Sequence, residues 1–221
     1  MKKLRLIILF FIASLFFTGC FLQTVHPLVE PENSILIPGL EGRWFDDDTR
    51  WTFINDISRF PELSPVFEGD PEQEEDSEFK NAYLVLYENL EDVNSDTALF
   101  VGSVTKLNGF YFLDLELWAK SLDELENTEN TFVDSHLFPV HTISKIRVDD
   151  EGLKLEFFKS SFIKELITSN RVRIKHEKVK DDILITASTE ELQKFVEKYA
   201  DDKEAFEDAI ELNYREPGNE N

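Results

Sequence analysis

Short strand-like segments separated by marked turns dominate the chain from residue 40 onward. The strongest turn is Asn108-Gly109, a dipeptide typical of two-residue β-hairpins, and turns at residues 150–152 and 180–182 separate further segments. Consecutive hairpins form an antiparallel meander, and many strands in one domain predict a barrel or a strongly curled sheet, because closure removes exposed edges. Nine strands are predicted, at residues 43–45, 50–55, 82–87, 98–106, 110–117, 140–148, 153–158, 171–179 and 183–187.

Helices are predicted only towards the C-terminus. Residues 160–168 can form a short amphipathic helix, and Ser188 with Glu191 forms a capping box that opens a second one. A further box at residues 201–204 predicts a third helix carrying Phe206 and Ile210. The expected fold class is therefore mainly β, an antiparallel barrel or curled sheet with short C-terminal helices that cover a sheet edge or a barrel mouth.

The first 19 residues have the layout of a secretory signal peptide. A basic head precedes residues 6–17, an apolar run that is interrupted only by Ser14 and is too short for a stable transmembrane helix. The expected organisation is a signal peptide at 1–19, a lipidated cysteine and a proline-rich tether at 20–39, one β-rich domain at 40–214 and a frayed tail at 215–221.

Phe17-Thr18-Gly19-Cys20 resembles the lipobox of bacterial lipoproteins, with phenylalanine where leucine is usual. Cys20 is the only cysteine, so the thiol required for acylation is the only one present and no intramolecular disulfide can form. The alternative is an ordinary secretory peptide with an incidental cysteine. The resemblance implies acyl chains on Cys20 that hold the protein on a membrane of the cell envelope. Because Phe21 rather than aspartate follows, it implies the outer membrane in a Gram-negative host.

The charge of the chain limits its partners. Removal of residues 1–19 would take away three basic residues and leave 20 basic against 45 acidic ones, a net charge of −25. Such a surface is expected to repel nucleic acid and anionic lipid headgroups. Sixteen phenylalanines would remain, which predicts a folded core rather than acidic disorder.

Several short motifs are spread along the chain: His26-Pro27-Leu28, Gly42-Arg43-Trp44, Trp51-Thr52-Phe53, Phe112-Leu113-Asp114-Leu115, Leu137-Phe138-Pro139-Val140-His141-Thr142 and Leu184-Ile185-Thr186-Ala187-Ser188-Thr189. Together they resemble a family of uncharacterised bacterial envelope lipoproteins, and this resemblance implies no activity or catalytic residue. Gly42-Arg43-Trp44 also resembles, distantly, the Gly-x-Trp signature of lipocalins. That resemblance implies that Trp44 closes one barrel end and packs on a late arginine, Arg171 or Arg173. Alternatively, Trp44 is simply a core residue.

Candidate chemistry centres on His136, His141 and His176. A metal site or a general base assisted by Asp114 or Glu116 competes with a structural interpretation, in which His141 orders a neighbouring turn. The structural interpretation is favoured, because the spacing of His136 and His141 matches no zinc-ligand pair. Asp114 and Glu116 are expected on the outer face of their strand, and the acidic run at residues 68–78 fails the EF-hand pattern. No metal, cofactor or enzymatic activity is expected.

Two functions remain open. The protein either binds a small apolar molecule in its barrel or cup, or it is a structural lipoprotein with a side-chain-filled core that meets another envelope protein. An enzyme would need His141 to converge with Asp114 or Glu116 in a cleft. The residues proposed to line an apolar site are Trp44, Phe100, Phe112 and Phe157, with Phe158 beside the last.

Overall fold

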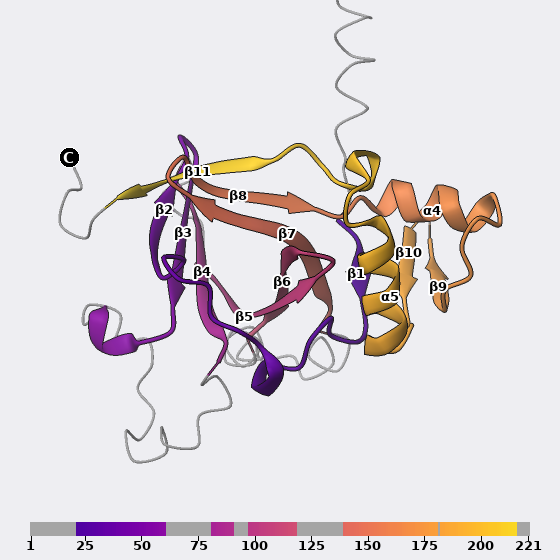
Figure 1. Cartoon of the computed structure of the whole chain (residues 1–221), viewed down its shortest axis with the longest axis horizontal. Coiled ribbons are helices and arrows are strands. Elements are labelled where there is room, and N and C mark those ends of the chain that lie inside the picture. Colours follow the sequence, from indigo (N-terminus) through magenta and orange to yellow (C-terminus); the bar gives the residue numbers. More distant parts are fainter. Residues whose placement is uncertain (1–20, 61–80, 91–96, 119–138, 181, 216–221) are drawn as a thin grey trace, which may run out of the picture.

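The computed structural model describes residues 21–60, 81–90, 97–118, 139–180 and 182–215. Eight strands close an antiparallel barrel, because β6 pairs with β7 and the last strand, β11, lies between β8 and β2 (Figure 1). The predicted fold class, a mainly β antiparallel barrel, is confirmed. The barrel strands are β2 (Gly42–Phe45), β3 (Thr49–Ile54), β4 (Tyr83–Asn89), β5 (Ala98–Leu107), β6 (Phe110–Leu117), β7 (His141–Asp149), β8 (Gly152–Phe157) and β11 (Ile210–Arg215).

Two predicted turns join barrel strands and depend on backbone conformations that glycine or asparagine adopts easily. Asn108 and Gly109 link β5 to β6 with φ angles of 48° and 85°. Gly152 opens β8 with φ of 134°, and a Cβ atom there would lie 2.4 Å from the carbonyl oxygen of Leu212 in β11. The glycine therefore allows β8 and β11 to approach closely.

Large apolar side chains fill the inside of the barrel. They alternate along the strands, as Leu113 and Leu115 do on β6, while the residues between them face outwards. The buried members of this barrel core are Ile37, Leu40, Trp44, Trp51, Phe53, Tyr83, Val85, Val104, Leu113, Leu115, Ile146, Leu153, Leu155, Phe157 and Leu212.

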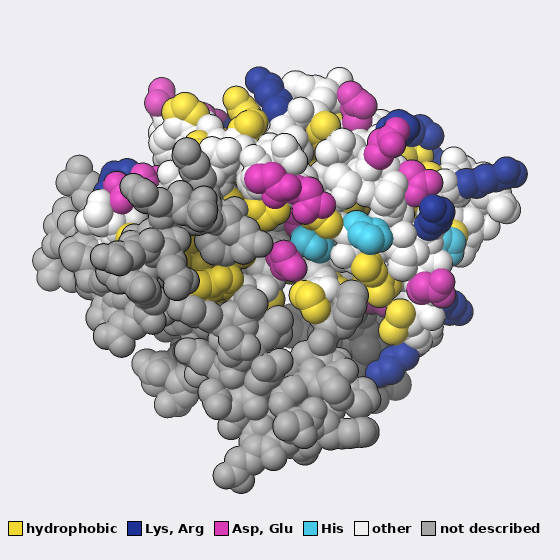
Figure 2. Space-filling view, turned by 90° about the horizontal axis from the view of Figure 1, so that it is seen from below, with side chains coloured by type: hydrophobic (Ala, Val, Ile, Leu, Met, Phe, Trp, Pro, Cys, Tyr) yellow, Lys and Arg dark blue, Asp and Glu magenta, His cyan; other side chains and the backbone are white. Residues whose placement is uncertain are grey.

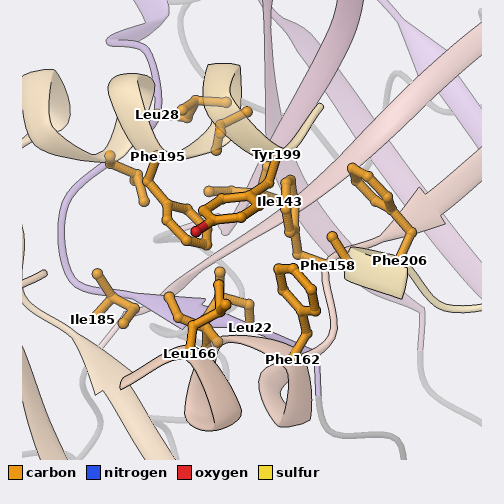
Figure 3. Packing of buried hydrophobic residues seen from close by; sticks show 14 of the residues in the cluster. Leu22, Leu28, Ile143, Phe158, Phe162, Leu166, Ile185, Phe195, Tyr199 and Phe206 are labelled. Atoms are coloured by element: carbon orange, nitrogen blue, oxygen red, sulfur yellow. The ribbon is translucent and has the colours of Figure 1, made fainter. Parts of the chain in front are cut away.

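A second unit, which we call the side lobe, packs against the outside of β6, β7 and β8. It consists of β1 (Gln23–Thr24), α4 (Ser160–Thr168), β9 (His176–Val179), β10 (Asp182–Ile185) and α5 (Thr189–Tyr199). β1 pairs with β7 on one side and runs parallel to β10 on the other. Its core is an aromatic and aliphatic cluster between the two helices and the barrel wall (Figure 3). The predicted helices at 160–168 and after Ser188 are both present, and Ser188 and Glu191 form the capping box.

The structure differs from the predicted tether and from the predicted third helix. Residues 21–39 are packed into the fold rather than free, since Leu22 and Leu28 are fully buried and β1 is part of the sheet. Residues 201–210 form no α-helix. Asp202 caps only the short 3-10 turn Lys203–Ala205, and Phe206 then continues extended into a bridge with Phe158 and towards β11.

The segment before β9 also differs from prediction. Residues 171–175, expected at the start of a strand, lie outside β9 because the N–H groups of Arg171 and Val172 both donate to the carbonyl of Leu166 at the end of α4. Only His176–Val179 pairs with β10. The end of α4 therefore decides where the strand can begin.

Candidate functional site at the barrel mouth

A hollow of about 740 Å³ opens at one end of the barrel, where segment 36–41 approaches the ends of β2, β4, β7 and β11. Apolar and polar residues both line it. The lining residues are Leu36, Ile37, Pro38, Gly39, Glu41, Trp44, Asn55, Arg59, Tyr83, Val148, Asp149, Asp150 and Tyr214. We call this site the mouth hollow.

Trp44 forms part of the wall of the mouth hollow. Its indole N–H donates to the carbonyl of Leu40 at 2.8 Å, and its ring meets Tyr214 of β11 edge-on, with centroids 5.3 Å apart. A Cβ atom on Gly42 would lie 2.6 Å from the Tyr214 ring, so glycine at this position leaves room for the tyrosine. The Gly-x-Trp pattern thus places two aromatic rings side by side at the mouth.

Tyr83 fixes the rim of the hollow. Its hydroxyl accepts the N–H of Ile37 at 2.7 Å and donates to the carbonyl of the same residue at 3.3 Å. Burial raises the pKa of Tyr83, so the hydroxyl keeps the proton that it donates. Segment 36–41 is therefore held against the barrel by a buried side chain rather than by surface contacts alone.

The charges of the mouth hollow lie at its edge. The Glu41 carboxylate binds Arg59 and accepts the N–H of Asp56 at 2.9 Å. Asp149 at the end of β7 and Asp150 in the following turn also border the hollow. An apolar wall with a few polar groups is the usual composition of a small-molecule site. This geometry suits a molecule with an apolar body and a polar or cationic end.

The structure separates the four residues that were expected to line one site. Trp44 borders the mouth hollow, and Phe157 lies in the barrel core, stacked on Phe21 at 4.4 Å. Phe100 is half-buried against the same core. Phe112 lies outside the barrel, in the core of the side lobe with Phe158.

Neither Arg171 nor Arg173 packs on Trp44, although the lipocalin resemblance implied that one of them would. Arg171 pairs with Glu165 at 3.5 Å in the side lobe, and Arg173 is exposed there. The aromatic partner of Trp44 is instead Tyr214, which sequence reasoning missed. The signal was present as the alternation of apolar Ile210, Leu212 and Tyr214, a period of two that indicates a strand.

A second, smaller pocket of about 170 Å³ lies on the outer face of the barrel, beneath residues 27–31. Asp114 is almost fully buried there, with Oδ1 3.0 Å from His141 Nδ1 and Oδ2 accepting the N–H of Leu28. Glu30 and Glu116 also border the pocket. Figure 2 shows acidic and histidine side chains close together on the face seen from below.

The electrostatics of this pocket favour a charged histidine. Burial alone would lower the pKa of His141, but the hydrogen bond to Asp114 and the carboxylates of Asp114, Glu116 and Glu30 outweigh it and raise the pKa. The side chains of His141 and Asp114 do converge, as an enzyme would require. Both oxygens of Asp114 are nevertheless engaged, one by His141 and one by the backbone of Leu28, so the pair ties the N-terminal segment to the barrel.

The other candidate residues do not join this pair. His176 is separated from His141 by the paired residues Ile185 and Thr24, three strand spacings or about 14 Å, and its Nδ1 lies 2.8 Å from the carbonyl oxygen of Ile174. Among the described residues, no group of three or more His, Cys, Asp or Glu side chains is placed to hold a metal ion. Cys20, His136 and the acidic run at 68–78 lie outside the described residues.

Comparisons of the chain with protein-family models, with curated proteins and with solved structures found no match. Within the described ranges, no helix has the length and apolar content needed to cross a membrane.

Proposed function

We propose that this protein is a lipid-anchored, non-catalytic lipoprotein of the bacterial cell envelope that binds a small, largely apolar molecule in the mouth of its barrel. The lipobox ending at Cys20 supports the anchor, and the eight-stranded barrel supports the binding role. The observation that carries the binding proposal is the mouth hollow of about 740 Å³, walled by the adjoining rings of Trp44 and Tyr214.

Two buried polar atoms of the barrel support a bound molecule further. Among the described residues, Trp51 Nε1 and Ser144 Oγ have no hydrogen-bond partner. Buried polar groups are nearly always satisfied, so each favours a ligand or water with a complementary atom over a fully self-satisfied core. Trp51 belongs to the same core as Trp44, and the two residues pair across β2 and β3.

The anchor is tested by expressing the full chain in a bacterial host beside the Cys20→Ser variant. The wild-type protein should lose residues 1–19, gain the mass of its acyl chains and sediment with the outer membrane of a Gram-negative host. Cys20→Ser should show no acyl mass. Cleavage at another position in the wild type, with a free thiol on Cys20, would contradict the proposal.

The binding role is tested with N-phenyl-1-naphthylamine, a neutral apolar dye, titrated into the mature protein. Leu36 and Leu90 offer a matched pair of variants, because their exposed fractions are 43% and 44% and only Leu36 borders the hollow. Leu36→Ser combined with Tyr214→Ser should weaken dye binding about tenfold, a loss equal to roughly 1.4 kcal/mol. Leu90→Ser should leave dye binding unchanged.

The second candidate is a structural or protein-interaction lipoprotein, and the side-chain-filled barrel core favours it. Native mass spectrometry separates the two functions. A consistent extra mass on protein purified gently from cells, lost on denaturation, supports the binding protein. A bare mass together with no dye binding supports the interaction protein, whose partner would then be sought by crosslinking in the envelope.

A further inference from the structure

We infer that the β9–β10 turn of the side lobe, together with the neighbouring start of the described chain, is a docking surface for the anionic headgroups of the membrane that carries the protein. We call this surface the basic edge; it consists of Lys178 and Lys180 with the apolar residues Phe21 and Val179. The inference rests on the proposed lipid anchor at Cys20. It gives the folded protein a defined orientation on the bilayer.

The charge of this region is opposite to that of the whole chain. Residues 171–180 contain five basic residues and one acidic residue, whereas the chain has a net charge of −22. All five basic side chains are exposed. In Figure 2, several Lys and Arg side chains gather at the right-hand end of the view, the end at which Figure 1 places the side lobe.

Most of this positive charge is not neutralised within the lobe. Arg171 pairs with Glu165 and Lys175 with Glu191, at 3.5 and 3.7 Å. Arg173, Lys178 and Lys180 form no ion pair with any residue that the structure describes. These three side chains can therefore interact with an external anion without first losing an ion pair to another described residue.

The start of the described chain lies at the same end of the lobe. Phe21 forms an isolated bridge with Lys159, and the next residue, Ser160, donates its hydroxyl to Asp182 at 2.6 Å. β1 runs parallel to β10 with Gln23 opposite Leu184. The same register, continued two residues towards the N-terminus, places Phe21 level with Asp182. Asp182 in turn pairs with Val179. The lipid-bearing end of the protein and the β9–β10 turn are thus neighbours.

The basic edge also exposes apolar surface. Phe21 is 42% exposed and Val179 is 50% exposed, although both are large apolar residues. Apolar side chains among lysines are typical of surfaces that lie in the membrane interface, where the rings and branched chains enter the headgroup region. The combination fits a lipid surface better than a soluble anion.

The anchor at Cys20 would hold the basic edge close enough to the bilayer for electrostatic attraction to act. Phe21 directly follows Cys20, and consecutive Cα atoms are about 3.8 Å apart, so no flexible spacer separates the anchor from the lobe. Electrostatic attraction to a charged bilayer extends over roughly 8 Å at physiological salt. A basic edge held this close to the surface lies within that range.

The test uses lipidated protein produced from the full chain and reconstituted into vesicles of phosphatidylcholine with or without 30% phosphatidylglycerol. Acylation occupies Cys20, so one introduced cysteine provides a single labelling site. A fluorophore on Val179→Cys reports on the basic edge, and one on Asp47→Cys reports on the exposed β2–β3 turn. A headgroup-attached quencher should quench the first label strongly in phosphatidylglycerol vesicles and weakly at 0.5 M salt, and should not quench the second.

Two charge-reversal pairs with the same change in net charge provide the control. In the Val179→Cys background, Lys178→Glu with Lys180→Glu should lower the ratio of docked to undocked protein at least roughly 25-fold, about fivefold for each lysine. Lys106→Glu with Arg147→Glu, on β5 and β7, should leave quenching unchanged. Equal quenching with and without phosphatidylglycerol, or equal effects of both pairs, would overturn the inference. A missing acyl mass before reconstitution would instead contradict the anchor itself.

Discussion

The barrel and the side lobe bury similar apolar residues but are assembled in different ways. Most barrel strands pair with their neighbours in sequence, through the hairpins β2–β3, β5–β6 and β7–β8. The lobe instead joins β1, near the start of the described chain, to β10, so that Gln23 pairs with Leu184. The difference teaches that local turn chemistry specifies the hairpins of the barrel, whereas the lobe, like the closure of the barrel by β11 against β2, depends on contacts between distant segments.

The two regions share one wall, and alternation along its strands divides the side chains between them. On β8 and the residue after it, Phe157 enters the barrel core and Phe158 enters the lobe core. On β6, Leu113 points inwards and Phe112 outwards. The lobe therefore covers apolar residues on the outside of the barrel that would otherwise be exposed to water.

The largest expected effect comes from breaking this shared wall. Phe158→Ala should lower the free energy of unfolding by about 3–5 kcal/mol, because the ring is 1% exposed and contacts Phe112, Phe195 and Phe206. Urea unfolding followed by far-UV and near-UV circular dichroism should show one transition, shifted for both signals. Two separated transitions would mean that the barrel and the lobe unfold independently.

Sequence reasoning identified the barrel hairpins, because Asn108-Gly109 and Gly152 carry turn information in one or two residues. It missed β1 and β11. A two-residue strand such as Gln23–Thr24 has no period to detect, and the charged residues 201–204 resembled a helix cap although the following residues alternate as a strand. Trp44 was recognised at the candidate site, but its neighbour Tyr214 depends on the pairing of β2 with β11, a contact between the two ends of the fold.

The second prediction concerns barrel closure alone. Gly152→Ala should cost roughly 2–3 kcal/mol of unfolding free energy, since φ of 134° is strained for alanine and the new methyl group would meet the Leu212 carbonyl. Thermal unfolding measures the loss. Gly109→Ala is the control: it has a positive φ but no atom within 4 Å of the added carbon, so its cost should be smaller. Equal costs would show that β8–β11 contact does not limit stability.

The third prediction concerns the segment that links lobe and barrel. Asp114→Ala should lower the free energy of unfolding by about 1–3 kcal/mol, because it leaves the buried N–H of Leu28 without its acceptor. Hydrogen exchange should show faster exchange at residues 22–29 than in the wild type. Glu116→Ala, two residues along the same face of β6 and less buried, should change stability by less than about 0.5 kcal/mol. A similar loss from both variants would assign the effect to general charge rather than to this contact.

The smallest expected effect is a dependence on pH, because burial and the surrounding carboxylates oppose each other at His141. The net result is a pKa raised above the ordinary value of about 6.5. The stabilisation from protonated His141 is therefore complete below about pH 6.5 and is lost as the pH rises through the higher pKa of the folded protein. Urea unfolding of the wild type between pH 6 and 9 should show this decline in stability. His141→Gln should remove that part of the slope, and His176→Gln on β9 should retain it. An unchanged slope in His141→Gln would mean that the Asp114–His141 contact contributes nothing to joining the N-terminal segment to the barrel.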